Sequence, residues 1–114
     1  MSQKGFVLLV GSDGLGRGDE ELGRLLMHRF LHELGSASTK PETALFINTG
    51  VKLVADDSPV LGQLKRLEET GVELLACSTC LERFGLMERV AVGSRTNMGH
   101  IVAALTAATK VVSV

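Results

Sequence analysis

The sequence contains no tryptophan, no tyrosine and only four phenylalanines in 114 residues. Aromatic rings are the platforms on which proteins stack nucleic-acid bases, so their scarcity disfavours nucleic acid as a partner. Twelve basic and thirteen acidic residues give a formal net charge of -1, which provides no overall field to attract nucleic acid or an anionic membrane. We therefore expect a protein that binds neither.

Long hydrophobic runs are also missing. The first run, residues 6–10, is shorter than the apolar part of a signal peptide, and no stretch approaches the ~20 apolar residues of a membrane span. We therefore expect a cytoplasmic protein. A hydrophobic content of 45% excludes a disordered chain, and the length suits one core. We predict a single domain over residues 1–114.

Five short runs rich in Val, Leu and Ile lack polar alternation, which is typical of strands covered on both faces. Helical patterns separate several of them, and such alternation predicts right-handed crossovers. The predicted fold class is α/β, a three-layer α/β/α sandwich with a mainly parallel five-stranded sheet. The predicted strands cover residues 6–11, 43–48, 72–77, 89–93 and 110–114.

Three longer helices are expected between these strands. The first covers residues 19–35 and ends at Gly35, the second starts with Ser58 as N-cap and Pro59 and ends at Gly71, and the third covers residues 96–109. Thr96 or Asn97 is the expected N-cap of the third helix. The predicted buried face of the first helix consists of Leu22, Leu25, Leu26, Phe30 and Leu34.

Ligands of parallel sheets usually bind at the carboxyl ends of the strands, where loops and helix N-termini present free backbone donors. The loop of residues 11–18 is rich in glycine, but it has neither the dinucleotide fingerprint nor the Lys-Ser/Thr of a phosphate loop. Lys52 and Arg95 are the cations expected nearest to this edge. The residues expected to line it are Asp13, Gly14, Gly16, Asn48, Gly50, Lys52, Thr79, Arg95 and Asn97.

The two cysteines, Cys77 and Cys80, form a C-x-x-C pair at the end of the third predicted strand. The T-x-x-E pattern that starts at Thr79 predicts a capping box, with Thr79 as N-cap, Cys80 at the first helical position and a helix end at Gly85. A helix start stabilises a thiolate and can lower its pKa from about 8.5. We interpret the pair as reactive thiols rather than as small buried hydrophobic residues.

A zinc site is disfavoured, because two sulfurs need two further ligands and the sequence has no second C-x-x-C and no histidine pair at finger-like spacing after the cysteines. His28 and His32 lie four residues apart, but on the polar side of the first predicted helix. We expect neither a metal nor a cofactor.

Four segments together resemble the DsrE-like sulfur-relay proteins, and most closely the carboxyl-terminal domain of the YedF-type sulfurtransferase-like proteins of selenium metabolism. These segments are FVLLVGSDGLGRGDEELGRLLMHRFL, FINTGVKLV, GVELLACSTCLERFGL and VAVGSRTNM. The resemblance covers nearly the whole chain. It implies an α/β/α domain that tends to form homo-oligomers and carries sulfur as a cysteine persulfide.

The resemblance also assigns roles to the two cysteines. Cys77 precedes Gly85 by eight residues, as the acceptor cysteine of the sulfur-relay members does, and Cys80 matches the second cysteine of their C-G-T-C variant. Ser78 replaces the glycine of that variant. The implied partners are sulfur donor and acceptor proteins, among them a TusA-like carrier, since a TusA-like domain usually precedes this one in YedF-type proteins.

Three functions stay open from the sequence. The first is a relay of sulfur or selenium, in which Cys77 accepts the cargo and Cys80 resolves the persulfide through a disulfide. The second is a dithiol oxidoreductase, although Pro41 and Pro59 both precede Cys77 while a thioredoxin needs a proline downstream of its dithiol. The third is a non-catalytic oligomeric binding module that does not need the thiols.

Overall fold

The protein forms a five-stranded, all-parallel sheet with the strand order β4-β3-β2-β1-β5, in a computed structural model that describes residues 6–114. The predicted α/β class and the five-stranded parallel sheet are confirmed. Residues 1–5, which the predicted single domain includes, lie outside the described residues. The strands are β1 (Val7–Val10), β2 (Thr43–Phe46), β3 (Glu73–Cys77), β4 (Ser94–Thr96) and β5 (Val111–Ser113).

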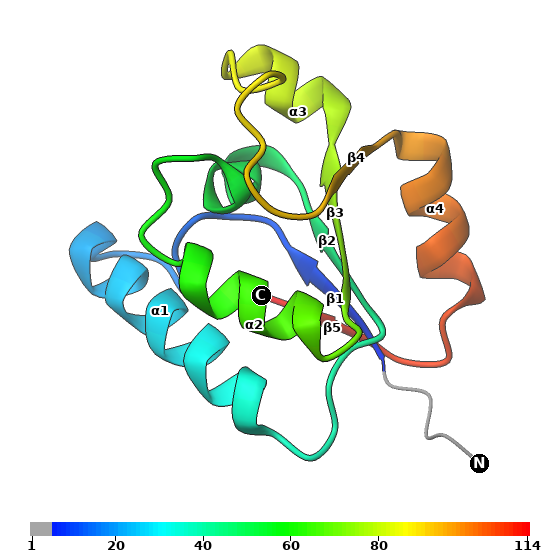
Figure 1. Cartoon of the computed structure of the whole chain (residues 1–114), viewed down its shortest axis with the longest axis horizontal. Coiled ribbons are helices and arrows are strands. Elements are labelled where there is room, and N and C mark those ends of the chain that lie inside the picture. The colour runs from blue at the N-terminus through cyan, green and yellow to red at the C-terminus, as the bar shows by residue number, and fades with distance from the viewer. Residues whose placement is uncertain (1–5) are drawn as a thin grey trace.

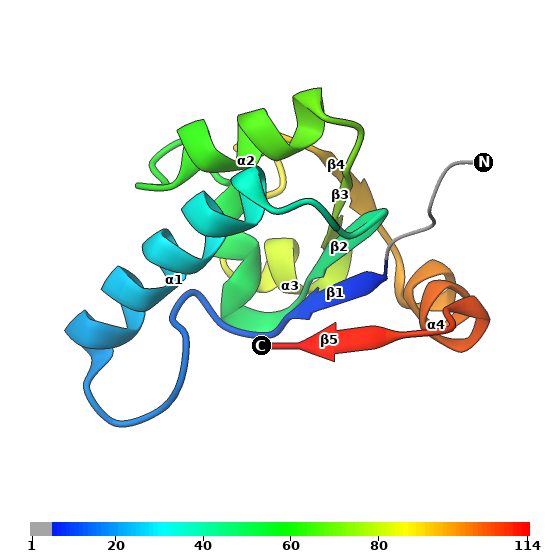
Figure 2. The ribbon, with the colours of Figure 1, turned by 90° about the horizontal axis from the view of Figure 1, so that it is seen from below.

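The helices form two layers around this sheet. Helices α1 (Glu20–Ser36) and α2 (Leu61–Glu69) lie side by side on one face, and α4 (Met98–Ala107) lies on the other (Figure 2). The chain adds β1 to β4 in one direction and then returns to place β5 beside β1. Since parallel crossovers are right-handed, this reversal of direction moves α4 to the opposite face.

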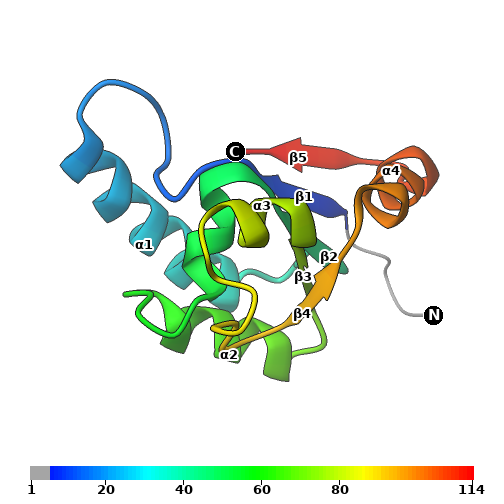
Figure 3. The same ribbon diagram turned by 90° about the horizontal axis from the view of Figure 1, so that it is seen from above.

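Two short helical elements lie where the strands end. The 3-10 helix η1 (Asn48–Val54) follows β2, and α3 (Ser78–Arg83) follows β3. Both are located at the carboxyl edge of the sheet, α3 at the top of Figure 1 and facing the viewer in Figure 3. The sequence predicted no helix over the residues of η1. The carboxyl edge is therefore more ordered than the sequence indicated.

The inner strands are covered on both faces, as their uniformly apolar sequences predicted. Ala44, Leu45 and Phe46 of β2 are all at most 1% exposed, although successive side chains of a strand point to opposite faces. The edge strands are more accessible. Val111 of β5 is 42% exposed, and Ser94 and Arg95 of β4 are exposed.

The predicted strand at residues 89–93 is wrong, because β4 comprises the three residues that follow it. Val90 instead forms an isolated antiparallel bridge with Ala55, just after η1. The Ala91 N–H donates to the Val54 carbonyl at 2.8 Å, so the backbone of this segment bonds to the end of η1 and not to β3. The apolar pattern of the run reflects this packing, in which Val92 is buried.

Helix α1 turns a different face to the core from the one predicted. Its buried residues are Gly23, Met27 and Leu31, whereas the leucines at positions 22, 25 and 26 are 40–49% exposed. Phe30 and Leu34 are partly buried. The prediction used only the large apolar side chains of the helix. It therefore missed Gly23, which lies on the side of α1 that packs against the rest of the chain. The helix also continues past Gly35 to Ser36.

The observed α2 and α4 differ from the predicted helices mainly in where they begin. Ser58 does not cap α2 directly, because its hydroxyl accepts from Val60 N–H at 3.1 Å in a turn that precedes the helix. Gly71, at φ 102°, follows the end of α2 as predicted. Asn97 is the N-cap of α4, and its Oδ1 accepts from His100 N–H at 2.8 Å. Within residues 6–114, none of the helices has the length and apolar character to cross a bilayer.

Gly50 allows η1 to approach the end of β1, since a Cβ atom at this position would overlap the Val10 carbonyl oxygen. We predict that Gly50→Ala lowers the free energy of unfolding by about 2 kcal/mol, because backbone has to move. The matched control is Gly62→Ala on α2, where a Cβ meets no atom within 4 Å. That change should raise the free energy of unfolding by roughly 0.5 kcal/mol, since alanine loses less backbone entropy in a helix.

Urea unfolding of the wild type and the two variants measures both effects. Equal stability of Gly50→Ala and the wild type would contradict the close approach of η1 to β1.

Candidate functional site

The two thiols are positioned by the junction between β3 and α3. Cys77 ends β3 and is the N-cap residue of α3, with φ -64° and ψ 122°. Ser78 Oγ donates to the Thr96 carbonyl at 2.7 Å, which ties the first residue of α3 to the end of β4. The predicted capping box is wrong, because no side chain caps α3 and Thr79 is an exposed residue within it. Cys80 is consequently the third residue of the helix.

The two thiols differ in exposure and in contacts. Both are free, but Cys77 is 0% exposed whereas Cys80 is partly exposed. The Asn48 N–H, at the start of η1, donates to Cys80 Sγ at 3.1 Å. Asn48 has φ 51°, in the left-handed region that asparagine tolerates better than most residues. The site therefore joins an enclosed thiol, an accessible thiol and a backbone donor from another element.

Burial raises the pKa of the Cys80 thiol above its ordinary value, and the hydrogen bond and charge interaction with the Cys77 thiol raise it further. The Asn48 N–H opposes this shift, because a donor stabilises the thiolate. The lowered pKa expected from a helix start is therefore not found for Cys80. The thiol form of Cys80 consequently predominates at neutral pH.

The glycine-rich loop contacts α1 rather than the thiols. Leu15 N–H donates to the Gly23 carbonyl at 2.9 Å, and a Cβ on Gly14 would lie 3.3 Å from the Gly23 carbonyl carbon. Gly16 has φ 85°, which favours glycine, and open space around it. Gly14 and Gly16 thus shape the loop. Asp13 at its start is linked to η1, since its N–H donates to Thr49 Oγ1 at 3.2 Å.

The two cations expected near the thiols are differently placed. Lys52 Nζ lies 4.8 Å from the centroid of the Phe84 ring, a cation–π contact between η1 and α3. Arg95 pairs in register with Ala76, so its side chain points to the face of the sheet opposite to that of Cys77. Arg95 Nη1 donates to the Met87 carbonyl at 3.2 Å, away from the thiols.

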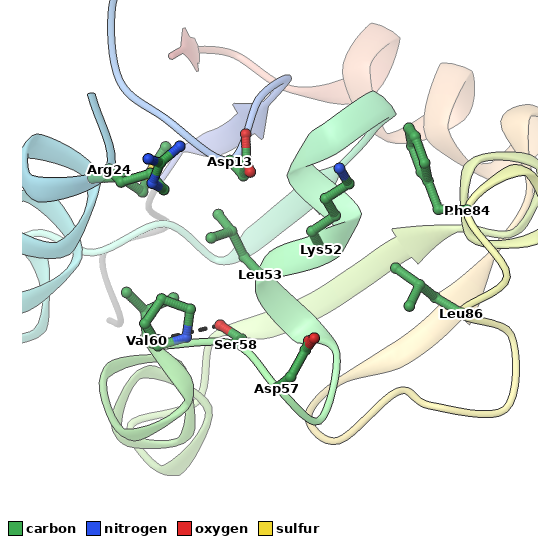
Figure 4. A pocket seen from close by; sticks show the side chains of 11 residues that line it. Asp13, Arg24, Lys52, Leu53, Asp57, Ser58, Val60, Phe84 and Leu86 are labelled. Atoms are coloured by element: carbon green, nitrogen blue, oxygen red, sulfur yellow. Dashed lines mark hydrogen bonds between the residues drawn. The ribbon is translucent and has the colours of Figure 1, made fainter. Parts of the chain in front are cut away.

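A cavity of about 410 Å³ lies beside this site (Figure 4). Its walls come from α1, η1, the segment 57–60 that precedes α2, and the residues that follow α3. Sequence reasoning placed Asp13 and Lys52 at this edge but missed Arg24, Phe84 and Asp57, which also line the cavity. The position of Phe84, four residues after Cys80, was an available signal, because such residues share a helix face. The remaining lining residues are Met27, Leu53, Ser58, Pro59, Val60 and Leu86.

The described part of the chain holds no cluster of three or more His, Cys, Asp or Glu side chains arranged to bind a metal ion. The site offers the chemistry of its two thiols, with the Asn48 N–H as the donor that stabilises a thiolate on Cys80.

The fold and site define an all-parallel α/β protein with a thiol pair at the carboxyl edge of its sheet. Residues 28–114 match the model of the DsrE/DsrF-like family, which is most of the chain, and this chain belongs to that family. Proteins of this family generally act in sulfur relay together with partner proteins. The comparison with curated proteins found no match.

Solved structures share the fold at low sequence identity. The ychN protein from E. coli matches with a TM-score of 0.75 and 15% identity, over 98% of this chain and 100% of that one. The protein MTH1491 from Methanobacterium thermoautotrophicum, described as of unknown function, matches with a TM-score of 0.68 and 20% identity over the same shares. BT1422 from Bacteroides thetaiotaomicron, described in the same way, has a TM-score of 0.64 and 18% identity over 95% of this chain and 94% of that one.

We predict that removal of Cys77 makes Cys80 reactive at lower pH. The interactions with the Cys77 thiol help to raise the pKa of Cys80, so Cys77→Ala should lower that pKa and move the half-maximum of the iodoacetamide alkylation rate to lower pH. Mass spectrometry of the peptide that carries Cys80 measures this rate. Cys77→Ser, which keeps a hydrogen-bonding group but no titrating thiol, should fall between alanine and wild type. An unchanged half-maximum in Cys77→Ala would contradict the coupling.

Proposed function

We propose that this chain is a persulfide relay protein of the YedF type, in which Cys77 carries the sulfur or selenium. In place of the sequence-based expectation that Cys77 accepts the cargo directly, we propose that Cys80 receives it first. The observation that supports this division is the pairing of an enclosed Cys77 with a partly exposed Cys80 at one sheet edge. A donor in solution reaches Cys80 first. Cargo on Cys77 is shielded from reductants by the surrounding core.

The proposed loading takes place in two exchanges. The Cys80 thiolate attacks the outer sulfur of a donor persulfide, R–S–SH, so that the donor S–S bond breaks, RS⁻ leaves and Cys80–S–SH forms. The Cys77 thiolate then attacks that outer sulfur, giving Cys77–S–SH and a Cys80 thiolate. Because the raised pKa keeps Cys80 mostly as the thiol at neutral pH, the attack proceeds through the small thiolate fraction, which the Asn48 N–H stabilises.

The outer sulfur can leave the Cys77 persulfide by two routes. An acceptor thiolate takes the outer sulfur after it has returned to Cys80, by the reverse of loading. Alternatively, the Cys80 thiolate attacks the inner sulfur of Cys77–S–SH, which forms a Cys77–Cys80 disulfide and releases HS⁻. The second route consumes the dithiol and requires later reduction of the disulfide by a thiol reductant.

The test is to incubate the reduced protein with inorganic polysulfide and to follow its intact mass. The wild type should gain one sulfur atom, which fragment-ion mass spectrometry should place on Cys77 and not on Cys80 within the peptide that carries both. Cys80→Ala should load roughly ten-fold more slowly or worse, equivalent to about 1.4 kcal/mol or more in the barrier, because Cys77 is enclosed. Cys77→Ala should gain sulfur on Cys80 and lose it quickly to added reductant.

The double variant Cys77→Ala, Cys80→Ala is the matched control and should gain no sulfur. Equal mass gains in the double variant and the wild type would refute the relay. So would a wild type that shows neither a sulfur gain nor the loss of two hydrogens that marks a Cys77–Cys80 disulfide. Equal loading rates in Cys80→Ala and the wild type would refute the role of Cys80 as entrance. Circular dichroism of each variant checks that the fold is retained.

A further inference from the structure

The cavity and the thiols are joined by two elements that run side by side. One contact between η1 and α3 is the hydrogen bond from Asn48 to Cys80, and another is the cation–π contact of Lys52 with Phe84. Phe84, which borders the cavity, follows Cys80 by four residues, and its N–H donates to the Cys80 carbonyl at 3.2 Å. The wall of the cavity therefore lies about one helical turn from the accessible thiol.

The size and lining of the cavity suit a small organic molecule. Its volume of about 410 Å³ lies within the range of roughly 300–1,000 Å³ typical of small-ligand sites. Leu53, Val60 and Leu86 give it an apolar lining, and the ring of Phe84 borders it. Charged groups stand at its rim, so that a ligand would need both an apolar part and charged ends.

The charges that line the cavity are of both signs, and Lys52 lies over the ring of Phe84. Arg24 and Lys52 make no ion pair within residues 6–114, and neither does Asp13. Figure 4 shows these three side chains along one rim, with Asp13 between the two cations. Asp57 is less available, since its carboxylate lies 3.6 Å from Arg89. A carboxylate in the ligand would suit the cations and an ammonium group would suit Asp13.

We propose that this cavity binds a low-molecular-weight thiol that carries both an ammonium and a carboxylate group, of the kind represented by cysteine and glutathione. Arg24 and Lys52 bind its carboxylate and Asp13 its ammonium group, while the sulfur-bearing arm extends past Phe84 towards Cys80. The proposal deepens the proposed function, because the persulfide of this thiol is then the donor R–S–SH. Transfer to Cys80 releases the parent thiol as RS⁻.

Binding is measured by isothermal titration calorimetry on the wild-type protein with S-methylglutathione and S-methyl-L-cysteine, which cannot exchange sulfur. At least one of them should bind saturably, and the tighter one identifies the size of the natural thiol. S-methylcysteamine, which lacks the carboxylate, and 3-(methylthio)propionate, which lacks the ammonium group, should bind about ten-fold more weakly or worse.

Arg24→Ala and Lys52→Ala should each weaken binding of the tighter ligand by about ten-fold. The matched controls are Arg29→Ala, on the same helix as Arg24, and Lys65→Ala on α2. Both positions are exposed, neither lines the cavity, and both variants should bind as the wild type does. Failure of both S-methyl ligands to bind, or unchanged affinity in Arg24→Ala and Lys52→Ala, would overturn the proposal.

These outcomes are separable from those of the relay test. If polysulfide loads Cys77 but neither S-methyl ligand binds, the relay stands and the thiol site is wrong. If an S-methyl ligand binds with the expected dependence on Arg24 and Lys52 but Cys77 never gains sulfur, the thiol site stands and the relay is wrong.

Discussion

The close approach of Gly50 to the Val10 carbonyl is the constraint on which the carboxyl edge of the sheet depends. A residue with a side chain would hold η1 away from β1. With glycine there, η1 lies close enough for the Thr49 hydroxyl to accept from Asp13 N–H. The same placement brings Asn48 to Cys80 at one end of η1 and Lys52 to the cavity further along. One backbone contact thereby sets the geometry of both the thiol pair and the cavity.

The environments of the thiols matter more for the proposed chemistry than their spacing. A C-x-x-C pair at a strand–helix junction is compatible with disulfide exchange, persulfide transfer and simple burial. Here one thiol is enclosed and the other is partly exposed and hydrogen-bonded, and the proposed order of transfer rests on this difference. The three solved structures reported above are at most 20% identical to this chain, so the roles of individual residues rest on contacts within this chain.

Periodicity predicted much of the fold and failed where packing overrode it. The runs that became β1, β2, β3 and β5 were recognisable because strands buried on both faces are uniformly apolar. Residues 89–93 looked the same but bond to the end of η1 instead. The contact face of α1 was misjudged because Gly23 has no side chain to count. The 3-10 helix η1 was missed because it is short and contains a glycine, although its buried Val51 and Val54 are three residues apart, as the period of a 3-10 helix requires.

The amino-acid sequence by itself determined the order of strands and helices and the place of Cys77 and Cys80 at the end of a buried strand. These features follow from the local spacing of apolar residues and from which residues are adjacent in the sequence. Only the tertiary structure decided which thiol is accessible and which charges surround the cavity. Such properties depend on contacts between distant parts of the chain, as between Asn48 and Cys80, which are 32 residues apart, and no local pattern encodes them.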